Sequence, residues 1–337
     1  MVQAVMLAFA ARLSGLREIV ERCGHRLHTH SFNSLSPALD RFSFREFVRR
    51  RVETLESAHR PCPGDIVAID GMAVTLPATQ RHRCAKYNHK AVGGGVVWAY
   101  LITAAKGVCP VKVIRIVQGA WNDSVVMRGV ALTARGPVYL MDRGFYCYEL
   151  IQQWLTDTVH FIVRLKERSL TYRVLQTVGP PRPHGKNRIL LDAKARLGKA
   201  DGEFRPLVRL VIALLPGGEK PILATDRFHW SAEKIADTYH LRWQIEGFHR
   251  FLKDSLGLAH LYSFSQTGIE FLIYTALLSA LLLFFADDHP SGLTITILRR
   301  MLRLIRRALG LGTPWKRNTY SCRRTKKKTG NRKEQNH

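Results

Sequence analysis

The pattern of apolar and polar residues changes character near residue 61. Before that point the chain is basic and has the spacing of amphipathic helices, as in residues 44–52, without a clear helix-turn-helix signature. Pro61, Pro63 and Gly64 interrupt this pattern, because proline and glycine disfavour a continuing helix. The apolar run at residues 66–69 then predicts a short buried β-strand.

Strands and helices alternate in the pattern as far as residue 166. After the first strand, the sequence predicts strands at residues 96–103, 111–117, 138–141 and 161–165, a turn at 107–110, and helices at 122–135 and 148–157. Asn122 or Asp123 would cap the first helix, and Gly136 and Pro137 would end it. Three strands followed by helix, strand, helix and strand predict a mixed sheet with crossover helices, and therefore an α/β fold.

A segment of different composition, residues 167–221, follows this pattern. Its isolated basic residues and β-type runs predict an inserted β-rich subdomain. Residues 222–225 return to a core strand. Ser231 then has the character of a helix N-cap, with Glu233 close behind it, and one long helix is predicted to extend to about Leu256.

One apolar segment, residues 269–286, resembles a membrane-spanning helix in composition. It contains a single acid, Glu270, and its length of about 18 residues is at the lower limit for crossing a bilayer. Because a polar helix precedes it and an arginine-rich stretch follows, we expect a buried core helix and no membrane partner. The chain thus divides into a helical basic N-terminal region, the first part of the α/β core, a β-rich insertion, the second part of the core and a basic tail, at residues 1–60, 61–166, 167–221, 222–312 and 313–337.

The charge of the chain indicates the class of its partner. The 337 residues include 52 Lys and Arg against 26 Asp and Glu, a formal net charge of +26. Such a field attracts polyanions, nucleic acid foremost, although a merely solvated basic surface would have the same composition. The six cysteines are scattered without a C-x-x-C pair, which argues against a disulfide framework and a zinc finger and favours a cytoplasmic setting.

Two aspartates directly follow predicted strands. Asp70 precedes Gly71, and Asp142 precedes Arg143. A carboxylate in such a place projects into the crevice where ligands bind in open α/β sheets. Either residue alone could be a turn acid or a helix cap, but two in the same kind of place favour a functional site.

The third candidate acid lies on the long predicted helix. At about 100° per residue, an arc of about 60° on one face contains four polar side chains, Tyr239, Arg242, Glu246 and Lys253. The apolar residues of this helix gather on another face, so it would pack by one side and present a polar stripe elsewhere. The alternative is a solvated face with an Arg242–Glu246 pair, which contributes only about 0.2–0.5 kcal/mol.

Three converging carboxylates would suit phosphodiester chemistry. Attack at phosphorus develops charge on the entering and leaving oxygens, and two Mg²⁺ ions about 3.5–4 Å apart stabilise both. Mg²⁺ prefers hard oxygen ligands, so Asp70, Asp142 and Glu246 are candidate metal ligands, and Mn²⁺ is expected to substitute. Arg242 and Lys253 would hold phosphates, the first through its planar fork and the second as a point charge.

These residues resemble the signatures of bacterial insertion-sequence DDE transposases, in the subgroup with a Tyr-Arg-Glu-Lys motif. The resemblance rests on Asp70-Gly71, on Asp142-Arg143-Gly144-Phe145, and on the spacing of Tyr239, Arg242, Glu246 and Lys253. It extends over about residues 65–260 and is weakest in the N-terminal region. It implies a ribonuclease H-like core with a β-rich insertion before the catalytic helix.

The resemblance also implies roles and an activity. Asp70, Asp142 and Glu246 would be the catalytic metal ligands. Contacts to transposon-end DNA would come from Tyr239, Arg242 and Lys253, and we add Arg143 beside Asp142. The implied reaction is nicking and strand transfer on double-stranded DNA, at terminal inverted repeats and target DNA, by a homodimer on paired ends.

Two other functions remain open. A related nuclease or resolvase would use the same fold to cut without joining. A DNA-binding protein descended from a transposase would show steep salt dependence and no metal-dependent activity. The charge is compatible with all three. Other chemistries are disfavoured, because residues 179–186 lack the spacing of a phosphate-binding loop and no G-x-S-x-G sequence is present.

Overall fold

The computed structural model describes most of the region in which the sequence places the core. The described residues are 20–21, 37, 41–57, 61–75, 94–102, 109–118, 122–258, 263, 265–285 and 295–308. The basic tail, most of the N-terminal region and part of the predicted turn at 107–110 lie outside them.

The first half of the core is a five-stranded mixed sheet in the order β3-β2-β1-β4-β5. Its strands are β1 (Ile66–Thr75), β2 (Gly94–Ile102), β3 (Cys109–Gln118), β4 (Val138–Met141) and β5 (His160–Arg164). The first three pair antiparallel, whereas β4 lies parallel to β1 and β5 lies parallel to β4. This arrangement is that of a ribonuclease H-like core, so the predicted fold class is confirmed.

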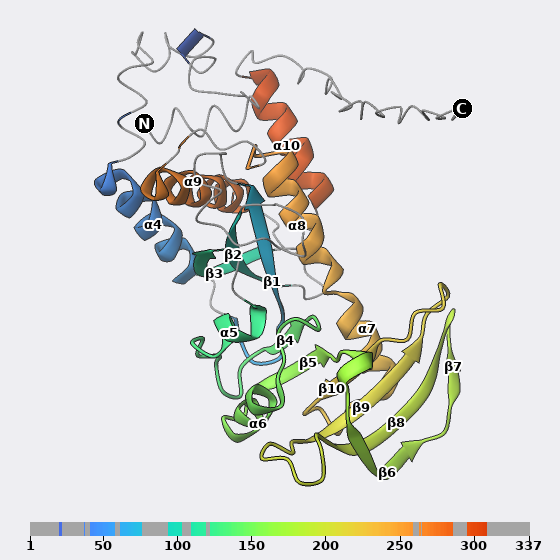
Figure 1. Cartoon of the computed structure of the whole chain (residues 1–337). Coiled ribbons are helices and arrows are strands. Elements are labelled where there is room, and N and C mark those ends of the chain that lie inside the picture. Colours follow the sequence, from blue (N-terminus) through green and yellow to red (C-terminus); the bar gives the residue numbers. More distant parts are fainter. Residues whose placement is uncertain are drawn as a thin grey trace, which may run out of the picture.

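The strands of residues 172–225 extend the same sheet. The order continues from β5 through β10 (Ile222–Thr225), β9 (Leu207–Leu214) and β8 (Asn187–Leu197) to β6 (Tyr172–Gly179), with β7 (Arg182–His184) beside β8. All these pairings are antiparallel. Figure 1 shows β6 to β9 projecting at one end of the molecule and the helices α4, α9 and α10 gathered at the other.

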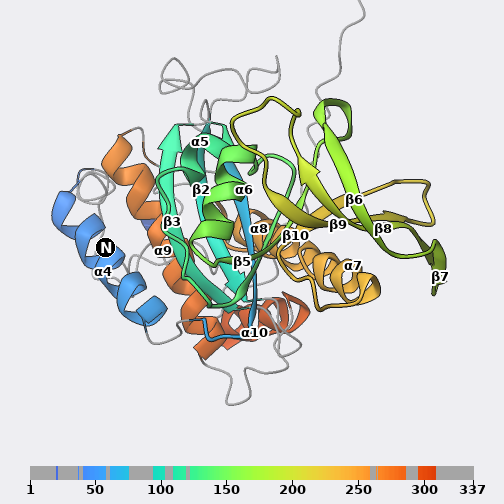
Figure 2. The same cartoon turned by 90° about the horizontal axis from the view of Figure 1, so that it is seen from below.

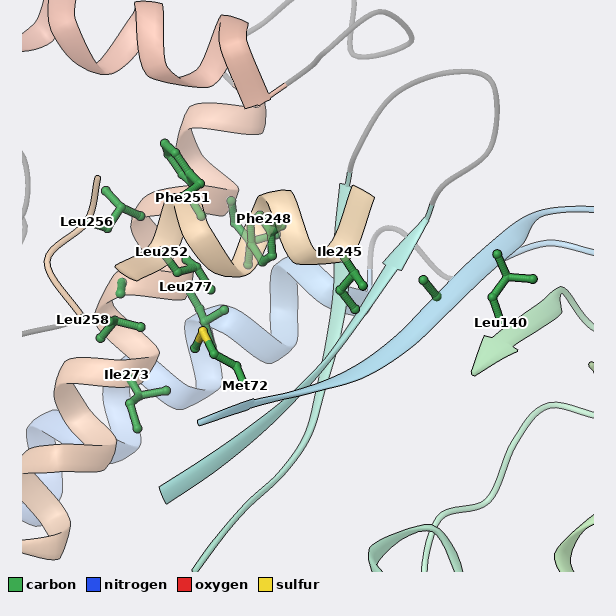
Figure 3. Close-up of a cluster of buried hydrophobic side chains, with 14 of the residues drawn as sticks. Met72, Leu140, Ile245, Phe248, Phe251, Leu252, Leu256, Leu258, Ile273 and Leu277 are labelled. Carbon is green, nitrogen blue, oxygen red and sulfur yellow. The ribbon is translucent and has the colours of Figure 1, made fainter. Parts of the chain in front are cut away.

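Helices cover both faces of the central strands, as Figure 2 shows from below. One face carries α5 (Asp123–Met127) and α6 (Tyr148–Thr156), and the other carries α4 (Phe42–Ser57), α8 (Trp243–Asp254) and α9 (Gln266–Phe285), with α7 (Ala232–His240) and α10 (Ile295–Ala308) at their ends. Successive residues of a strand point to opposite faces, so Val67 and Ile69 pack towards α6 while Ala68 and Met72 pack towards α8 and α9. Figure 3 shows Met72 pointing towards side chains of these two helices.

The apolar segment predicted as a core helix forms α9. Among the described residues it is the one helix long and apolar enough to cross a membrane, but most of that window is buried within the protein. Its acid, Glu270, accepts a hydrogen bond of 2.8 Å from Arg45 Nη1 on α4. A buried face and a paired acid are the features of a core helix, as the sequence predicted.

Three predicted elements are wrong in extent or continuity, while the other boundaries predicted from residue 66 onward agree with the described strands and helices within three residues. The first strand continues past residue 69 to Thr75, because it keeps an antiparallel partner in β2. The helix expected at residues 122–135 ends at Met127, where turns replace it. The long helix expected from Ser231 is divided into α7 and α8 at Leu241 and Arg242.

Candidate active site

Strand register places the two aspartates side by side. The parallel pairing of β1 with β4 ends at Ile69 opposite Met141, so Asp70 and Asp142 are the next residues on neighbouring strands. Each aspartate lies two residues after one that packs towards α8, Ala68 on β1 and Leu140 on β4, and residues two apart on a strand point to the same face. The two carboxylates therefore project from adjacent positions on the same face.

The setting of Asp70 differs from the prediction in one respect. Asp70 lies within β1, opposite Ala99 of β2, and does not end the strand. What ends there is the pairing with β4. The sequence predicted a crevice at the end of a strand. In the structure, the corresponding place is where β1 continues beside β2 while the chain leaves β4 at Asp142.

The helical half of the site is α7, α8 and the tight turn between them. The backbone N–H of Arg242 donates to Tyr239 O at 3.0 Å, and that of Ile245 donates to Arg242 O at 3.1 Å. These three-residue steps are those of a 3₁₀ turn, which is narrower than an α-helical turn. The uniform helical face predicted for this motif is therefore wrong, although its members still converge on the aspartates.

Arg242 is the centre of this convergence. Its Nη2 donates to Glu246 Oε1 at 2.8 Å, and its Nη1 lies 3.7 Å from Asp70 Oδ2. Tyr239 donates its hydroxyl to Asp142 Oδ1 over 3.4 Å, and its ring lies beneath the same guanidinium. The structure thus brings the three predicted acids around two residues of the predicted motif.

Burial changes the ionisation of this cluster. The pKa of Asp70 rises to about 7, first because of desolvation and further because of Asp142 and Glu246, while Arg242 and the N–H of Gly71 oppose the rise. Burial likewise raises the pKa of Tyr239, which keeps the phenol protonated as a donor. Asp70 is therefore a carboxylate that a further cation would stabilise in its charged form.

Two predicted DNA-binding residues lie at the edge of the cluster. Arg143 is exposed immediately after Asp142. Lys253 is half-buried near the end of α8, and burial lowers its pKa, with Asp254 and Asp70 opposing the change. Arg242 differs from both, because it is buried against acids in this conformation.

The sequence analysis assigned no role at the site to three residues of this neighbourhood. His249 is buried with Nδ1 3.9 Å from Asp70 Oδ2, and burial lowers its pKa to about 3, so it is neutral. Asp123, predicted as a cap, lies so close to Gly144 that a Cβ there would meet its Oδ2 at 2.1 Å. Trp243, beside Arg242, has 61% of its surface exposed. The i,i+3 spacing of Glu246 and His249 on one helix was the available signal for the histidine.

The donor set suits a hard divalent cation, since all three acids are carboxylates. Within the part of the chain that the structure describes, however, no three Asp, Glu, His or Cys side chains are gathered closely enough to ligate one ion. Arg242 stands between Asp70 and Glu246 and pairs with both. The residues fit a metal in chemical type, and Glu246 would have to leave Arg242 to join the aspartates.

Comparison with known proteins finds relatives among bacterial transposases. A transposase for insertion sequence element IS5377 of Geobacillus stearothermophilus is 24% identical over 234 residues, which are 69% of this chain and 59% of that protein. A transposase for element IS4SA of Synechocystis is 25% identical over 263 residues, or 77% of this chain and 72% of that protein. The chain thus spans only about three fifths of the first of these relatives.

A solved structure and a family model complete the comparison. The piggyBac transposase synaptic complex with hairpin DNA covers 94% of this chain at a TM-score of 0.46 and 11% identity. The model of the Transposase DDE domain matches residues 61–282, from the start of the core to near the end of α9. The subgroup with the Tyr-Arg-Glu-Lys motif remains a prediction. Because the matched region is most of its length, the chain belongs to the DDE transposase family.

Proposed function

We propose that this protein cuts DNA at transposon ends and joins those ends to target DNA, with Asp70, Asp142 and Glu246 as its catalytic residues. The observation that carries the proposal is their arrangement. Two aspartates occupy adjacent positions on parallel strands, and Arg242 links one of them to the glutamate of α8. Family membership supports the same reaction class.

The three carboxylates would hold two Mg²⁺ ions, for which Mn²⁺ substitutes. The ions would supply charge stabilisation at the entering and leaving oxygens. In the conformation described, Arg242 neutralises Asp70 and Glu246 and keeps these acids close together. Tyr239 directs its hydroxyl at Asp142 Oδ1. Release of Arg242 from Glu246 would free a guanidinium fork for a phosphate.

Several exposed groups around the acids suit a nucleic-acid strand. Arg143 offers a cation beside Asp142, and Trp243 offers an aromatic face beside Arg242. Bases stack on such faces without regard to sequence, and cations hold the backbone. We place the reaction on terminal inverted repeats and target DNA in the cytoplasm, and we propose a homodimer that pairs two ends.

Isosteric variants test the assignment. Asp70→Asn, Asp142→Asn and Glu246→Gln keep the shape of each side chain and remove its charge. Each is expected to lower Mg²⁺-dependent cleavage of DNA that carries the element's ends by about a thousandfold or more, the scale of single catalytic residues. Asp254→Asn is the matched control, because Asp254 is exposed near the end of the same helix. Full cleavage by any of the three variants would show that the assignment is wrong.

A strand-transfer assay separates transposition from simple cutting. Wild-type protein is expected to join a pre-cut 3′ end to a target plasmid. Cleavage without joining would instead identify a nuclease or resolvase on the same fold. Salt-sensitive binding with neither reaction would identify a DNA-binding protein that has lost its chemistry.

A further inference from the structure

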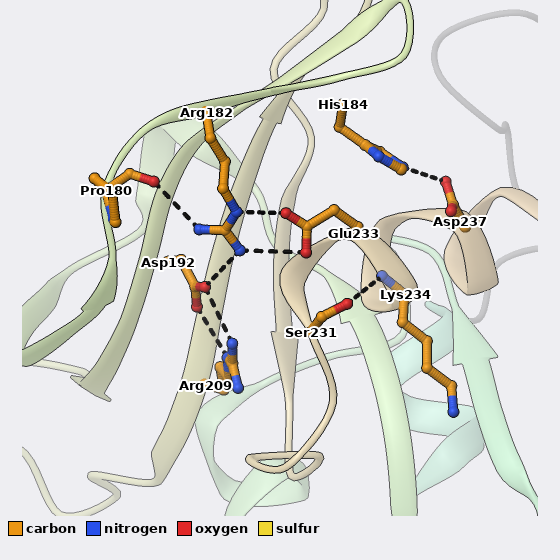
Figure 4. Close-up of polar contacts among 9 residues, drawn as sticks. All are labelled: Pro180, Arg182, His184, Asp192, Arg209, Ser231, Glu233, Lys234 and Asp237. Atoms are coloured by element: carbon orange, nitrogen blue, oxygen red, sulfur yellow. Dashed lines mark hydrogen bonds and ion pairs between the residues drawn. The ribbon is translucent and has the colours of Figure 1, made fainter.

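A network of charged side chains joins the strands of the insertion to α7, as Figure 4 shows. Arg182 on β7 donates from Nε and Nη2 to the two carboxylate oxygens of Glu233, in the first turn of α7, with Nη2 3.2 Å from Oε2. The same Nη2 lies 3.2 Å from Asp192 Oδ2 on β8. A fork that engages both oxygens of a carboxylate fixes its direction as well as its distance.

The insertion side of this network is anchored in the protein interior. Asp192 on β8 is 2% exposed and Arg209 on β9 is 4% exposed. Arg209 donates Nε and Nη2 to the two oxygens of Asp192 at 2.9 and 3.0 Å, and Nη1 to the carbonyl of Phe228 before α7. A buried carboxylate that accepts bonds from two guanidinium groups is held in one geometry.

Two further features support the contact between the insertion and α7. His184 on β7 lies with Nε2 2.7 Å from Asp237 Oδ1, one helical turn beyond Glu233. Gly179 leaves room for the arginine, because a Cβ at that position would lie 2.6 Å from Arg182 Nη1. The bond from Arg182 also lowers the pKa of Glu233 to about 2, so the pair stays ionised through neutral pH.

Four of the five N–H donors of Arg182 are taken up by the protein itself. Its Nε and Nη2 bind Glu233, its Nη2 also reaches Asp192, and its Nη1 donates to the carbonyl of Pro180 at 3.2 Å. A cation that held DNA phosphate would need this fork free. The contacts therefore favour a role in holding α7 over a role in binding the substrate directly.

The position of α7 matters to the active site. This helix has nine residues and is followed by the turn at Leu241 and Arg242. A helix so short depends on tertiary contacts for its position. One face of α7 packs into the core through Ile235, and the charged network holds a second face. Tyr239, near the end of the helix, contacts Asp142.

We infer that Arg182 is a positioning residue for DNA cleavage: through Glu233 it sets α7 so that Tyr239 orients Asp142. The inference rests on the proposed function. It assigns the insertion a part in arranging the active site, in addition to any contact that its strands make with DNA.

A double-mutant cycle tests this role. The variants are Arg182→Gln, Glu233→Gln and the two combined, with Arg188→Gln as the matched control, an exposed cation on the same β7–β8 hairpin. Single-turnover cleavage is measured at saturating DNA, and DNA affinity is measured separately in Ca²⁺. We expect each single change to slow cleavage at least tenfold, the double change to slow it no further, and the control to remain within twofold of wild type.

DNA affinity distinguishes positioning from substrate binding. We expect the affinity of all four proteins to stay within twofold of wild type. Weaker binding by Arg182→Gln but not by Glu233→Gln would overturn the inference in favour of a direct phosphate contact. Cleavage within twofold of wild type in either single variant, or a double variant whose defect is the product of the single defects, would also overturn it. If Arg182→Gln does not fold, Glu233→Gln decides alone, because it leaves the bond of Arg182 to Asp192 in place.

Two controls separate this inference from the proposed function. An inactive wild-type protein would contradict the proposed function. An active wild type, an inactive Asp142→Asn and a fully active Arg182→Gln would overturn the positioning role alone. Hydrogen exchange without DNA gives a further readout: amides of α7 should exchange at least tenfold faster in Arg182→Gln and Glu233→Gln, and those of α6 should not. Unchanged exchange in α7 would also overturn the inference.

Discussion

The strand half and the helix half of the candidate site are built in different ways. Asp70 and Asp142 are placed by the register of two parallel strands, which backbone hydrogen bonds fix residue by residue. Tyr239 and Glu246 lie on two short helices that a 3₁₀ turn joins. The strands present a fixed pair of carboxylates, whereas the helices reach that pair through side chains, Tyr239 directly and Glu246 by way of Arg242.

This difference indicates that the helices, not the strands, are the part of the site that can move. A strand pair can shift only by a whole register step, which would turn every side chain to the other face. A helix that packs through side chains can move by fractions of a turn at small cost. We therefore expect the rearrangement that would bring Glu246 to the aspartates to occur in α8 and in its junction with α7.

The largest expected effect tests whether packing holds the helix half. Phe248 of α8 is fully buried, so Phe248→Ala should lower the free energy of unfolding by about 3–5 kcal/mol. Leu140→Ala, an equally buried change on β4, should cost about 2–5 kcal/mol. Urea unfolding measures both. A Phe248 variant as stable as wild type, beside a destabilised Leu140 variant, would show that α8 is not packed as described.

The next effect concerns the charge of the strand half. The pKa of Asp70 is raised from 3.8 to about 7, chiefly by burial. The folded state therefore holds this proton more tightly than the unfolded state. The contribution of Asp70 to the free energy of unfolding is greatest below about pH 4 and is lost as the pH rises through 7. In chelator, wild type should lose about 1–3 kcal/mol between pH 5 and pH 8 relative to Asp70→Asn. Parallel curves for the two proteins would contradict the raised pKa.

The third effect uses an exposed residue at the junction of the two helices. Trp243→Ala should leave stability within about 0.5 kcal/mol of wild type, because the side chain is mostly in solvent. It should weaken binding of a DNA end by about 1–3 kcal/mol if one base stacks on the indole. Leu304→Ala, an exposed apolar change on α10, is the control. Equal affinity of the two variants would exclude stacking at this position.

The smallest effect concerns how well the strand half tolerates a methyl group at Gly144. A Cβ at residue 144 would meet Asp123 Oδ2 at 2.1 Å, so Gly144→Ala requires the carboxylate of Asp123 to turn away. The end of a short side chain moves at little cost, and we expect a loss of about 1 kcal/mol by thermal unfolding. A loss as large as that of Phe248→Ala would mean that Asp123 is fixed as firmly as the strands.

The sequence predicted the strand half more closely than the helix half for physical reasons. Short continuous apolar runs identify strands buried on both faces, and the predicted residues 138–141 and 222–225 are those of β4 and β10. The end of β1 was misplaced at Ile69 because its continuation to Thr75 depends on pairing with β2, a partner distant in the sequence. Helix 122–135 was overestimated because β-branched residues and Gly129 oppose a helix that local pattern alone allowed.

The break between α7 and α8 was not predictable from local sequence. Neither proline nor glycine lies between Tyr239 and Glu246, so helix propensity gives no sign of it. The break accompanies tertiary contacts, the burial of Arg242 against Asp70 and Glu246 and the exposure of Trp243. The identities of the converging residues were therefore predictable, whereas the shape of the backbone that carries them was not.

The continuity of the sheet from β5 through β10 into β9 has a consequence for anyone who shortens the chain. Removal of residues 172–214 would leave one side of β10 without its ladder partner. An unprotected row of peptide N–H and C=O groups invites pairing between molecules. A trimmed protein is therefore expected to self-associate and precipitate. The strands of residues 172–214 thus protect the edge of the core sheet from pairing with other molecules.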